Sequence, residues 1–546
     1  MDFSTIQGFI LKKNELLKDI SFCKNLEEFY PYFKKSKTSR LLNHRSLKIK
    51  DYTIRSIQEI ILGFILKPNF YSNDDYISLL SEQYKLDGKE GELFEKIKSC
   101  FENLFSPYNK IVAYMDGLLR KKRFEDVLQI YRDHLTPRYF ERKNWGQVYT
   151  PFYLICRILN QIPDEIWKDK NSKFFDPAAG MGGFLVIVYH KLMFTLKEKI
   201  TDEKQRHDHI IRNMLYAADI DEVNISWMRK IFGSHLHVYH GDTLSTDILQ
   251  YFGVQGFQVI VGNPPFEKPQ TKDTRRNAGD SLWIDFVWKS LTEWIAPNGY
   301  FGMLLPPGWR KPSDENSRSR DIWRFLSVEN TPLWIEMYDA KESKELFDGN
   351  ASIRFDLVFL KNRPNYHYLT KIKQTNGAQV EKILSGIPYL PNNDLKYWFK
   401  LFHSKHKHKV DVLYSSSVYR SDKQSISREK TPAFKYKVIH SIHKDGKIVY
   451  LYTNKKIKEG GFGIPKIIFN RFGGWNKPIL DLEGKYGMSQ DTFGIKIDSK
   501  EEGDEIIKYF NLSTLKKFEQ DMSWATSKPT IFWKMFYSFP RNFYDV

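Results

Sequence analysis

The chain has 546 residues, and its 84 Lys and Arg against 66 Asp and Glu give a net charge of +18. With 41% hydrophobic and 15% aromatic residues, it has enough apolar surface to offset the entropy cost of ordering, which excludes a disordered chain. The length allows about three to four domains of ~150 residues, and the three cysteines lack the Cys-x-x-Cys spacing of a zinc site and are too few for a disulfide framework.

The sequence also lacks the signals of membrane insertion and export. No apolar run approaches the ~18 residues that span a bilayer, and the first residues lack the basic, apolar and small-residue order of a signal peptide. We therefore expect a cytoplasmic protein with no membrane partner. The positive charge favours a polyanionic partner, although a Lys-rich composition produces the same balance without one.

Three regions differ in sequence pattern. Residues 1–120 show Lys-rich amphipathic patterns typical of helices and carry no chemical motif, so we expect a helical region of unknown role. Residues 121–365 alternate short apolar runs with longer helical patterns, which indicates an α/β fold with a parallel sheet buried on both faces. Residues 366–546 lose this alternation and predict a mixed α/β domain with scattered strands and loops rich in Gly and Ser.

Each polar motif of the middle region follows an apolar run, and ligands of parallel sheets bind beyond the carboxyl ends of the strands. The first motif, residues 176–184, reads Asp-Pro-Ala-Ala-Gly-Met-Gly-Gly-Phe and precedes an apolar helix pattern. Its glycines allow a tight turn and close approach to a ligand, although an ordinary turn has the same composition. The third glycine of a dinucleotide fingerprint is absent, and so is a phosphate-binding Gly-Lys-Ser/Thr.

Two more carboxylates follow the next two apolar runs. Asp219, followed by Ile220, can accept hydrogen bonds from both hydroxyls of a ribose, and Asp242 can accept one from the exocyclic amine of an adenine. Each also fits a purely structural position, because Asp favours helix N-caps and turns. Taken singly, neither residue decides between these interpretations.

The sharpest motif is Asn263-Pro264-Pro265-Phe266, at the end of an apolar strand pattern. The two prolines fix the backbone and remove two N–H donors, so the nearby carbonyls act as acceptors only. The Asn263 side-chain oxygen and the Pro264 carbonyl can then accept both hydrogens of one amino group, while the Phe266 ring stacks on the planar group that bears it. The alternative is a rigid loop with a buried Phe.

In this order, the motifs resemble those of S-adenosylmethionine-dependent N6-adenine DNA methyltransferases of the gamma arrangement, as found in restriction-modification systems. The resemblance covers about residues 120–365 and implies a Rossmann-like methyltransferase sheet with helices on both faces, followed by a target-recognition domain. It implies that the catalytic residues are Asn263, Pro264, Pro265 and Phe266. The cofactor-binding residues that it implies are Thr150 and Pro151 of an upstream Gly-x-x-x-Thr-Pro segment, Asp176, Pro177, Ala178, Gly180, Gly182 and Phe184 of the loop, and Asp219, Ile220 and Asp242.

The same resemblance implies the reaction and the partners. S-adenosylmethionine is the methyl donor, no metal takes part, and the target adenine is flipped out of double-stranded DNA before direct in-line transfer to N6. A bacterial, phage or viral setting is expected, with a separate restriction endonuclease as a further partner. Phe266 stands where Tyr is commoner in the family, and a Phe ring stacks equally well without the hydroxyl.

Some other methyl-transfer reactions use related motifs, and the sequence does not exclude all of them. N4-cytosine methylation uses the same amine-gripping geometry, and so does methylation of protein glutamine or of RNA amines. Cytosine-C5 chemistry is disfavoured, because it needs a Cys nucleophile after Pro and the sequence contains no Pro-Cys pair. An enzyme that also cuts DNA would need a nuclease signature in residues 1–120, where we find none, and a non-catalytic DNA-binding protein is disfavoured by the intact motifs.

The C-terminal region concentrates the positive charge. Residues 401–480 hold 17 Lys and Arg against 5 Asp and Glu, which is 17 − 5 = +12 of the total +18. Aromatic residues are interleaved with this charge, and the combination favours nucleic-acid binding over a solvated surface alone. They are Tyr414, Tyr419, Phe434, Tyr436, Phe462, Phe469, Phe472 and Trp475.

Smaller signals carry weaker expectations. Residues 306–311, Pro-Pro-Gly-Trp-Arg-Lys, fit a wall of a DNA cleft or a rigid surface loop with solvated Arg and Lys. Phe355 or Phe359 fits either a second contact with the flipped base or a buried strand. We expect the three Trp of residues 282–295 and Cys156 to lie in the core, and we expect no metal at the triplet His403, His406 and His408.

Overall fold

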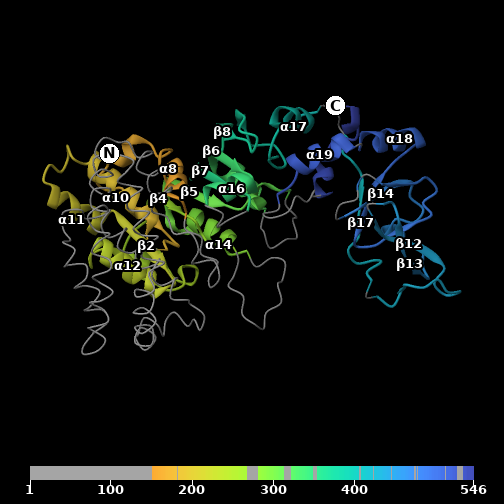
Figure 1. The fold of residues 1–546 in the computed structure, drawn as a ribbon, viewed down its shortest axis with the longest axis horizontal. Helices are drawn as coiled ribbons and strands as arrows, with labels where there is room; N and C mark the ends of the chain where they lie inside the picture. Colours follow the sequence, from red (N-terminus) through yellow and green to blue (C-terminus); the bar gives the residue numbers. More distant parts are fainter. Residues whose placement is uncertain are drawn as a thin grey trace, which may run out of the picture.

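The computed structural model describes the chain from Thr150 to Asp545, with short gaps, and the helical prediction for residues 1–120 lies outside the described residues. The described residues are 150–180, 182–266, 281–312, 321–347, 353–404, 408–421, 423–443, 445–471, 475, 477–510, 512–524 and 533–545. They form an elongated molecule with one large sheet at one end and two smaller sheets at the other (Figure 1).

The large sheet has nine strands in the order β3-β2-β1-β4-β5-β7-β6-β8-β9. Its strands are β1 (Phe174–Asp176), β2 (Leu215–Asp219), β3 (His237–His240), β4 (Phe257–Gly262), β5 (Ile295–Leu305), β6 (Thr331–Tyr338), β7 (Phe355–Lys361), β8 (Leu369–Lys373) and β9 (Gln379–Ile383). The first five strands in this order are parallel, as predicted. Beyond β5 the sheet is mixed, because β7 runs antiparallel to both β5 and β6.

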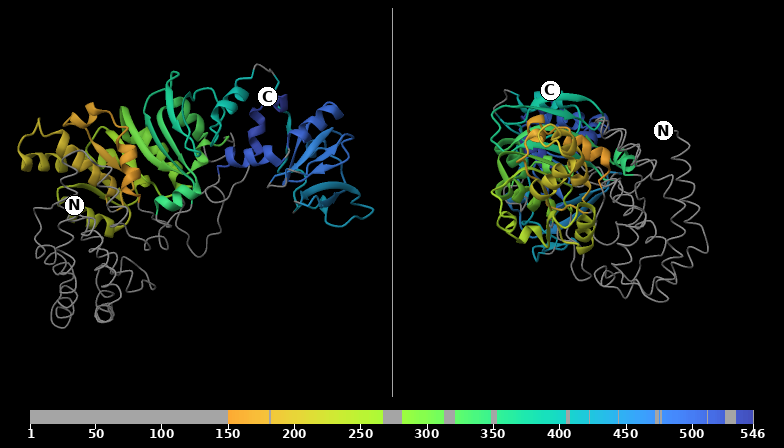
Figure 2. Two further views of the ribbon diagram at one scale, coloured as in Figure 1. Left: turned by 45° about the horizontal axis from the view of Figure 1, so that its top comes forward. Right: turned by 90° about the vertical axis from the view of Figure 1, so that its left-hand side faces the viewer.

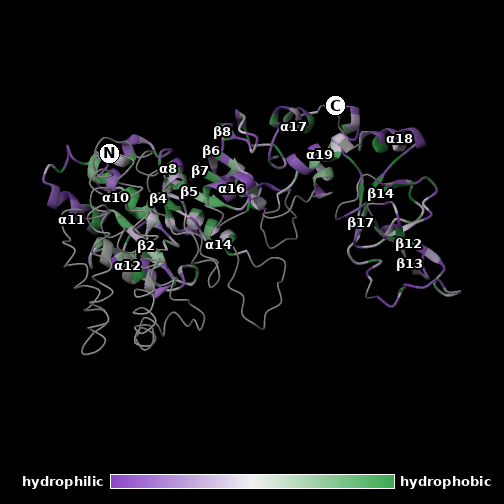
Figure 3. Ribbon diagram, viewed as in Figure 1, coloured by the Kyte–Doolittle hydropathy of each residue, from purple (hydrophilic) through white to green (hydrophobic). Residues whose placement is uncertain are grey.

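Helices cover both faces of the sheet, as predicted. The helices of this part are α8 (Phe152–Leu159), α9 (Asp164–Lys168), α10 (Gly183–Thr195), α11 (Glu203–Asn213), α12 (Glu222–Phe232), α13 (Ile248–Phe252), α14 (Leu282–Lys289), α15 (Ile322–Arg324) and α16 (Ala340–Leu346). α8 packs against β5 and β7, and α10 packs against β1. On the opposite face Trp283 and Val287 of α14 share a core with Phe175 and Ile260. Because both faces are covered, the central strands are apolar almost throughout (Figure 3).

The sheet continues past residue 365, where the sequence pattern placed a domain boundary. β8 pairs in parallel with β6, and β9 closes the sheet as its edge strand. The burial of β9 alternates between half-buried and exposed, unlike the continuous apolar runs of the central strands. The strand–helix alternation that defined the predicted catalytic region therefore ends before its sheet does.

The C-terminal part contains two four-stranded sheets, which lie beside helices at the far end of the molecule (Figure 2). The strands are β10 (Val412–Leu413), β11 (Ile426–Ser427), β12 (Tyr436–Ile442), β13 (Ile448–Thr453), β14 (Lys466–Asn470), β15 (Ile479–Asp481), β16 (Gly487–Met488) and β17 (Thr492–Lys496). One sheet has the order β10-β17-β14-β15 and the other β11-β13-β12-β16. The helices are α17 (Leu395–Phe402), α18 (Lys500–Tyr509) and α19 (Leu512–Asp521).

Most of the aromatic residues interleaved with the positive charge turn out to be core residues. Tyr419, Phe462, Phe469 and Trp475 are at most 4% exposed. Phe469 stacks on Phe493, with ring centroids 5.4 Å apart. The prediction that this aromatic set contacts nucleic acid was therefore wrong for these four residues, because aromatic spacing in short strands also builds a core. Tyr414, Phe434 and Tyr436 are half-buried, and Phe472 lies outside the described residues.

The segment of residues 306–311 joins the two parts of the molecule rather than lining a cleft. Arg310 and Asp356 are each 1% exposed or less, and Arg310 Nε donates to Asp356 Oδ2 at 2.7 Å. The same guanidinium donates to the Leu390 carbonyl and to Asn392 Oδ1, each at 3.0 Å. Asn392 Nδ2 in turn donates to the Ser523 carbonyl at 2.8 Å, just after α19. The expectation of a solvated Arg310 was wrong.

The remaining core predictions are resolved by burial. Phe355 and Phe359 are at most 1% exposed, and they stack on Tyr338 and Tyr300. Both therefore occupy buried strand positions, which leaves no ring face for a flipped base. The predicted core position of Cys156 is confirmed, as are those of Trp283 and Trp294, while Trp288 stacks on Phe325 with centroids 3.7 Å apart.

The buried Arg310–Asp356 pair gives a stability prediction. Asp356→Ala leaves the guanidinium buried without its carboxylate, so we expect a loss of about 3–5 kcal/mol in the free energy of unfolding. Urea denaturation followed by tryptophan fluorescence measures it. Glu483→Ala, which breaks the exposed pair of Glu483 with Lys485, is the control and should leave the midpoint unchanged. An unchanged midpoint for Asp356→Ala would contradict the role of this pair in joining the two parts.

Candidate active site at the carboxyl edge of the sheet

The polar motifs meet at one edge of the large sheet. Asp176 and Asp219 are the last residues of β1 and β2, Asp242 lies two residues after β3, and Asn263 directly follows β4. These four strands are parallel neighbours, so their carboxyl ends lie side by side. The predicted convergence of the motifs is confirmed by this topology.

The loop after β1 is held by backbone hydrogen bonds to β2. Ala179 N donates to the Ala218 carbonyl at 3.0 Å, and Gly180 N donates to Asp219 Oδ2 at 2.8 Å. Gly182 has φ +88°, and a Cβ there would lie 3.2 Å from the Met228 side chain of α12. Glycine at 182 is therefore favoured by the backbone conformation, and a Cβ there would also press against the Met228 side chain. α10 begins directly after it.

Asp219 is the most heavily bonded side chain of the site. Its Oδ1 accepts from Asp221 N at 2.8 Å and from Asn224 Nδ2 at 3.1 Å, while its Oδ2 accepts from Gly180 N. A carboxylate offers about four acceptor positions, so three are occupied and one on Oδ2 stays available. The adjacent Ile220 is 60% exposed, an unusual position for an apolar side chain beside a buried carboxylate. The pair thus presents an acceptor and an apolar surface together.

Burial sets the protonation of the two carboxyls. Burial raises the pKa of Asp219 to about 6, against hydrogen bonds from Asp221, Asn224 and Gly180 that lower it. Burial also raises the pKa of Asp176 to about 8, with the Ala178 N–H opposing the shift and the charge of Asp219 adding to it. Asp176 therefore favours the protonated form in the folded state. Its contribution to stability is present below the unfolded pKa and is lost as the pH rises through about 8.

The end of β4 is crowded and rigid. A Cβ at Gly262 would lie 2.7 Å from Asp176 Oδ1, so only glycine fits between the two motifs. Pro264 is buried, while Asn263 and Pro265 are half-buried and Phe266 packs partly against the core below the sheet. Asn263 Nδ2 donates to Thr150 Oγ1 at 3.0 Å across 113 residues of sequence. The upstream segment and the Pro-Pro motif are thus in direct contact.

Asp242 serves a structural role in addition to any ligand contact. Its Oδ1 accepts from Leu244 N at 3.0 Å and starts a short 3₁₀ turn at Thr243–Ser245. Thr243 Oγ1 donates to the Pro177 carbonyl at 2.9 Å, which ties this turn to the cofactor loop. The two interpretations of Asp242 are therefore compatible, because a carboxylate has a second oxygen.

Two residues of the site escaped the sequence analysis. Asn224 is fully buried on α12 and orients Asp219, and Thr243 holds the Pro177 carbonyl. Asn224 lies outside the motifs, and Thr243 directly follows Asp242 within the His-Gly-Asp-Thr-Leu run of residues 240–244, but no role was predicted for either. Phe184 is 4% exposed on α10, so it packs behind the loop rather than on its open side.

The described residues contain no cluster of three His, Cys, Asp or Glu side chains that could hold a metal ion. Of the His triplet, His406 lies outside the described residues. Within the described part of the chain, no helix is both long enough and apolar enough to cross a membrane.

Together, a sheet of this strand order and a Gly-rich loop beside a buried carboxylate define a Rossmann-like methyltransferase with a site for an adenosyl cofactor. Residues 126–306 match the family of N-6 DNA methylases. This match confirms the prediction of an S-adenosylmethionine-dependent N6-adenine DNA methyltransferase for residues 126–306, which are about a third of the chain, and it supports an enzyme. The match ends at residue 306, before the C-terminal sheets.

The comparison with solved structures matches restriction-modification proteins at low sequence identity. The Type IIL restriction-modification enzyme MmeI, solved with DNA, is 13% identical, with a TM-score of 0.46, over 94% of this chain and 86% of that one. The Type I restriction enzyme EcoKI M protein is 14% identical, with a TM-score of 0.31, over 65% of this chain and 71% of that one. No curated protein matches the sequence.

The pKa of Asp219 predicts how cofactor binding depends on pH. Ribose hydroxyls donate to the ionised carboxylate, so the Kd for S-adenosylmethionine should rise below about pH 6, by up to tenfold per pH unit. Isothermal titration calorimetry between pH 5 and 8 measures it. Asp219→Asn should bind weakly at every pH, whereas the exposed Asp208→Asn should reproduce the wild-type profile. A Kd that is flat across this range would contradict the assignment of Asp219.

Proposed function

We propose that this enzyme methylates N6 of adenine in double-stranded DNA, with Asn263 and the Pro264 carbonyl gripping the target amino group. One observation carries the proposal. The Asn-Pro-Pro-Phe run ends β4 directly beside Asp176 of the cofactor loop, where even a Cβ at Gly262 would not fit. A reacting amine at the first motif and a methyl donor at the second would therefore be immediate neighbours.

The chain contributes position and electrostatics rather than covalent chemistry. S-adenosylmethionine supplies an electrophilic methyl group on a sulfonium. The N6 lone pair is delocalised into the purine ring, so the amine is a poor nucleophile. Two acceptors, Asn263 Oδ1 and the Pro264 carbonyl, would bind its two N–H groups, bring N6 closer to sp³ and reduce the conjugation of its lone pair with the ring. Phe266 would stack on the flipped base. N6 would then displace S-adenosylhomocysteine from the methyl group in line, with no covalent enzyme intermediate, and lose one of its two protons to water.

The residues at the edge of the sheet fit an adenosyl cofactor. Asp219 keeps one acceptor position for a ribose hydroxyl, and the exposed Ile220 offers an apolar surface to the cofactor adenine. Asp242 would accept from the amine of that adenine, and Thr150 with Pro151 would lie at the methionine end. The remaining residues shape the loop, namely Asp176, Pro177, Ala178, Gly180, Gly182 and Phe184.

The C-terminal sheets carry an exposed basic surface suited to DNA phosphates. We define the β12–β13 basic surface as Arg428, Lys430, Lys435, Lys437, Lys455 and Lys456, all of which are exposed. Lys435 and Lys456 lie over the Tyr436 ring at 5.3 and 5.0 Å, and Lys437 lies over Tyr450 at 4.6 Å. Half-buried rings thus hold ammonium groups at the surface, which leaves their charge available to a phosphate.

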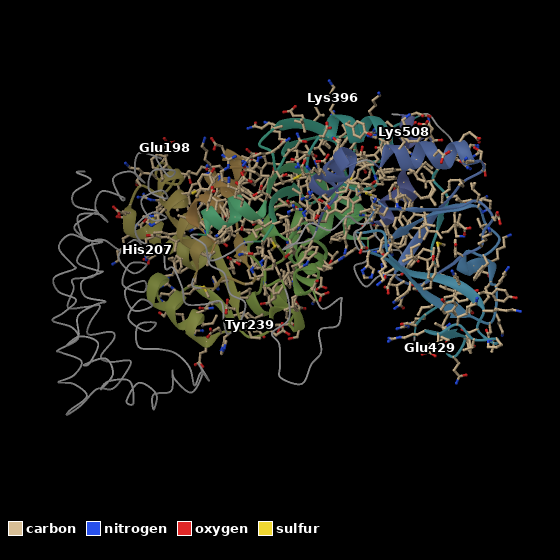
Figure 4. The ribbon with its side chains drawn as sticks, turned by 45° about the vertical axis from the view of Figure 1, so that its right-hand side comes forward. Glu198, His207, Tyr239, Lys396, Glu429 and Lys508 are labelled. Carbon is tan, nitrogen blue, oxygen red and sulfur yellow. The ribbon has the colours of Figure 1, made fainter. Side chains whose placement is uncertain are left out.

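This surface and β3, an edge strand of the large sheet, lie on the same side of the molecule in the view of Figure 4. Figure 4 shows Tyr239 of β3 and Glu429, which follows β11, on one side, with Lys396 and Lys508 on the opposite side. Tyr239 is one residue from the carboxyl end of β3. A duplex bound along the first side would contact both parts of the molecule. This placement supports a role as target-recognition domain for residues 366–546.

Two alternatives use the same grip. N4 of cytosine presents an equivalent amine, and an amine of RNA or of a glutamine side chain would also fit the two acceptors. The family match favours adenine, and the basic surface favours a nucleic-acid substrate over a protein. A separate restriction endonuclease as partner and a cytoplasmic location stay predictions.

Asn263→Ala tests the proposed grip. Losing one of two acceptors should lower methyl transfer to DNA by at least about 10²-fold, because the substitution removes a group that acts in the transition state. The assay follows tritium from labelled S-adenosylmethionine into genomic DNA of a methylation-deficient host. The Kd for the cofactor should stay within about threefold of wild type. Full activity in this variant would contradict the proposal.

The β12–β13 basic surface predicts a change in salt dependence. Replacing Lys435, Lys437 and Lys456 with Gln should flatten the slope of log Kd for DNA against log salt by about 0.9 for each phosphate that is no longer neutralised. Fluorescence anisotropy with labelled duplex DNA measures it. The matched control replaces the exposed Lys396, Lys400 and Lys508, an equal charge on α17 and α18. An equal slope change in both triple variants would show that only net charge matters.

A further inference from the structure

The contact between Thr150 and Asn263 links two motifs that are 113 residues apart. We propose that Thr150 is a positioning residue for methyl transfer, whose hydroxyl holds the Asn263 amide with Oδ1 facing the target amino group. The inference rests on the proposed role of Asn263, and it adds a function for Thr150 that cofactor binding does not require.

The need for such a residue follows from the shape of an amide. The two ends of the Asn side chain are nearly equal in size, but one accepts a hydrogen bond and the other donates. Only the orientation with Oδ1 toward the substrate accepts an N–H of N6, because the reversed amide sets two donors against each other. Asn263 Nδ2 donates to Thr150 Oγ1 at 3.0 Å. Because a hydroxyl can also donate, this contact selects the productive orientation when the Thr150 proton is given to another acceptor.

Thr150 is itself held by a rigid helix. Pro151 follows it and caps α8, with its carbonyl accepting from Leu154 N and Ile155 N. Arg157 of α8 donates twice to the buried Glu336 of β6, at 3.0 and 3.1 Å. Since this pair fixes α8 against the sheet, the hydroxyl of Thr150 stays over the end of β4 instead of moving with a loose segment.

The hydroxyl can serve the cofactor and the amide at once. A Thr hydroxyl has one donor and two acceptor positions, and the amide of Asn263 uses one acceptor. Its proton is then available for an acceptor of the bound cofactor. The Thr150 hydroxyl would thus contact the cofactor and orient the Asn263 amide. Its effect on the amide must therefore be measured at saturating cofactor, where weaker cofactor binding does not change the rate.

Thr150→Val and Thr150→Ser separate these roles. Val keeps the shape but removes the acceptor, so at saturating S-adenosylmethionine and DNA we expect kcat to fall by about 10- to 100-fold. Ser keeps the hydroxyl and should restore kcat to within about threefold. The assay uses tritiated cofactor and genomic DNA from a methylation-deficient host. Thr292→Val, which removes an exposed hydroxyl bonded to the Trp288 carbonyl, is the control.

Three outcomes would overturn the inference. A raised Kd or KM for the cofactor with wild-type kcat would show that Thr150 acts on the cofactor alone. An unchanged kcat in both Thr150→Val and Thr150→Ala would show that the amide orients itself. An equal loss in Ser and Val would show that shape, and not the hydroxyl, matters. Full activity of Asn263→Ala would contradict the proposed function itself. Loss of activity in Asn263→Ala together with wild-type kcat in Thr150→Val would contradict only the role of Thr150.

Discussion

The carboxylate of Asp219 is the interaction on which the site depends. It receives hydrogen bonds from the loop after β1, from its own turn and from α12. The loop thereby closes onto β2, and the turn exposes Ile220 beside the one acceptor position that remains. Without a buried acceptor at the end of β2, the glycines of the loop would have no fixed partner. The cost of burying it appears as a raised pKa.

A second constraint acts at the end of β4, where the close approach of Asp176 to the strand leaves no room for a side chain at residue 262. Gly262 lets Asp176 approach the strand, and the following prolines carry the chain away without free N–H groups. The loop after β1 and the Asn-Pro-Pro-Phe run, which we propose bind the cofactor and the substrate, are therefore immediate neighbours. α8 adds Thr150 from a third direction, anchored by the Arg157–Glu336 pair. The side chains of the site are thus positioned by the ends of the strands and by α8, which the Arg157–Glu336 pair holds against the sheet.

Much of this arrangement could be predicted from the sequence because the motifs follow strands, and parallel strands end at one edge. Asp176, Asp219, Asp242 and Asn263 were placed correctly on this ground. Asn224 and the Thr150–Asn263 contact could not be found, because they depend on how α12 and α8 pack. The mixed part of the sheet was missed because β7 follows a helix, α16, and yet runs antiparallel to β6, while β8 and β9 follow with no helix between them. Aromatic residues between lysines were misinterpreted as a binding surface, because short strands use the same spacing for a core.

The buried Arg310 shows why charge alone is a poor guide to function. It lies in a sequence that is typical of a basic surface loop, yet each nitrogen of its guanidinium donates to a neighbour in one of the two parts of the molecule. Lys466, counted in the basic region, is likewise fully buried and paired with Asp481. The charge exposed at the surface is therefore smaller than the count of Lys and Arg in the sequence.

Methyl transfer to N6 of adenine is the reaction that the site is proposed to perform. Mass spectrometry of nucleosides tests it most directly, after unmethylated DNA has been incubated with the enzyme and isotopically labelled S-adenosylmethionine. We expect label in N6-methyladenine and in no methylated cytosine. Label in N4-methylcytosine, or in protein or RNA with none in DNA, would contradict the assignment.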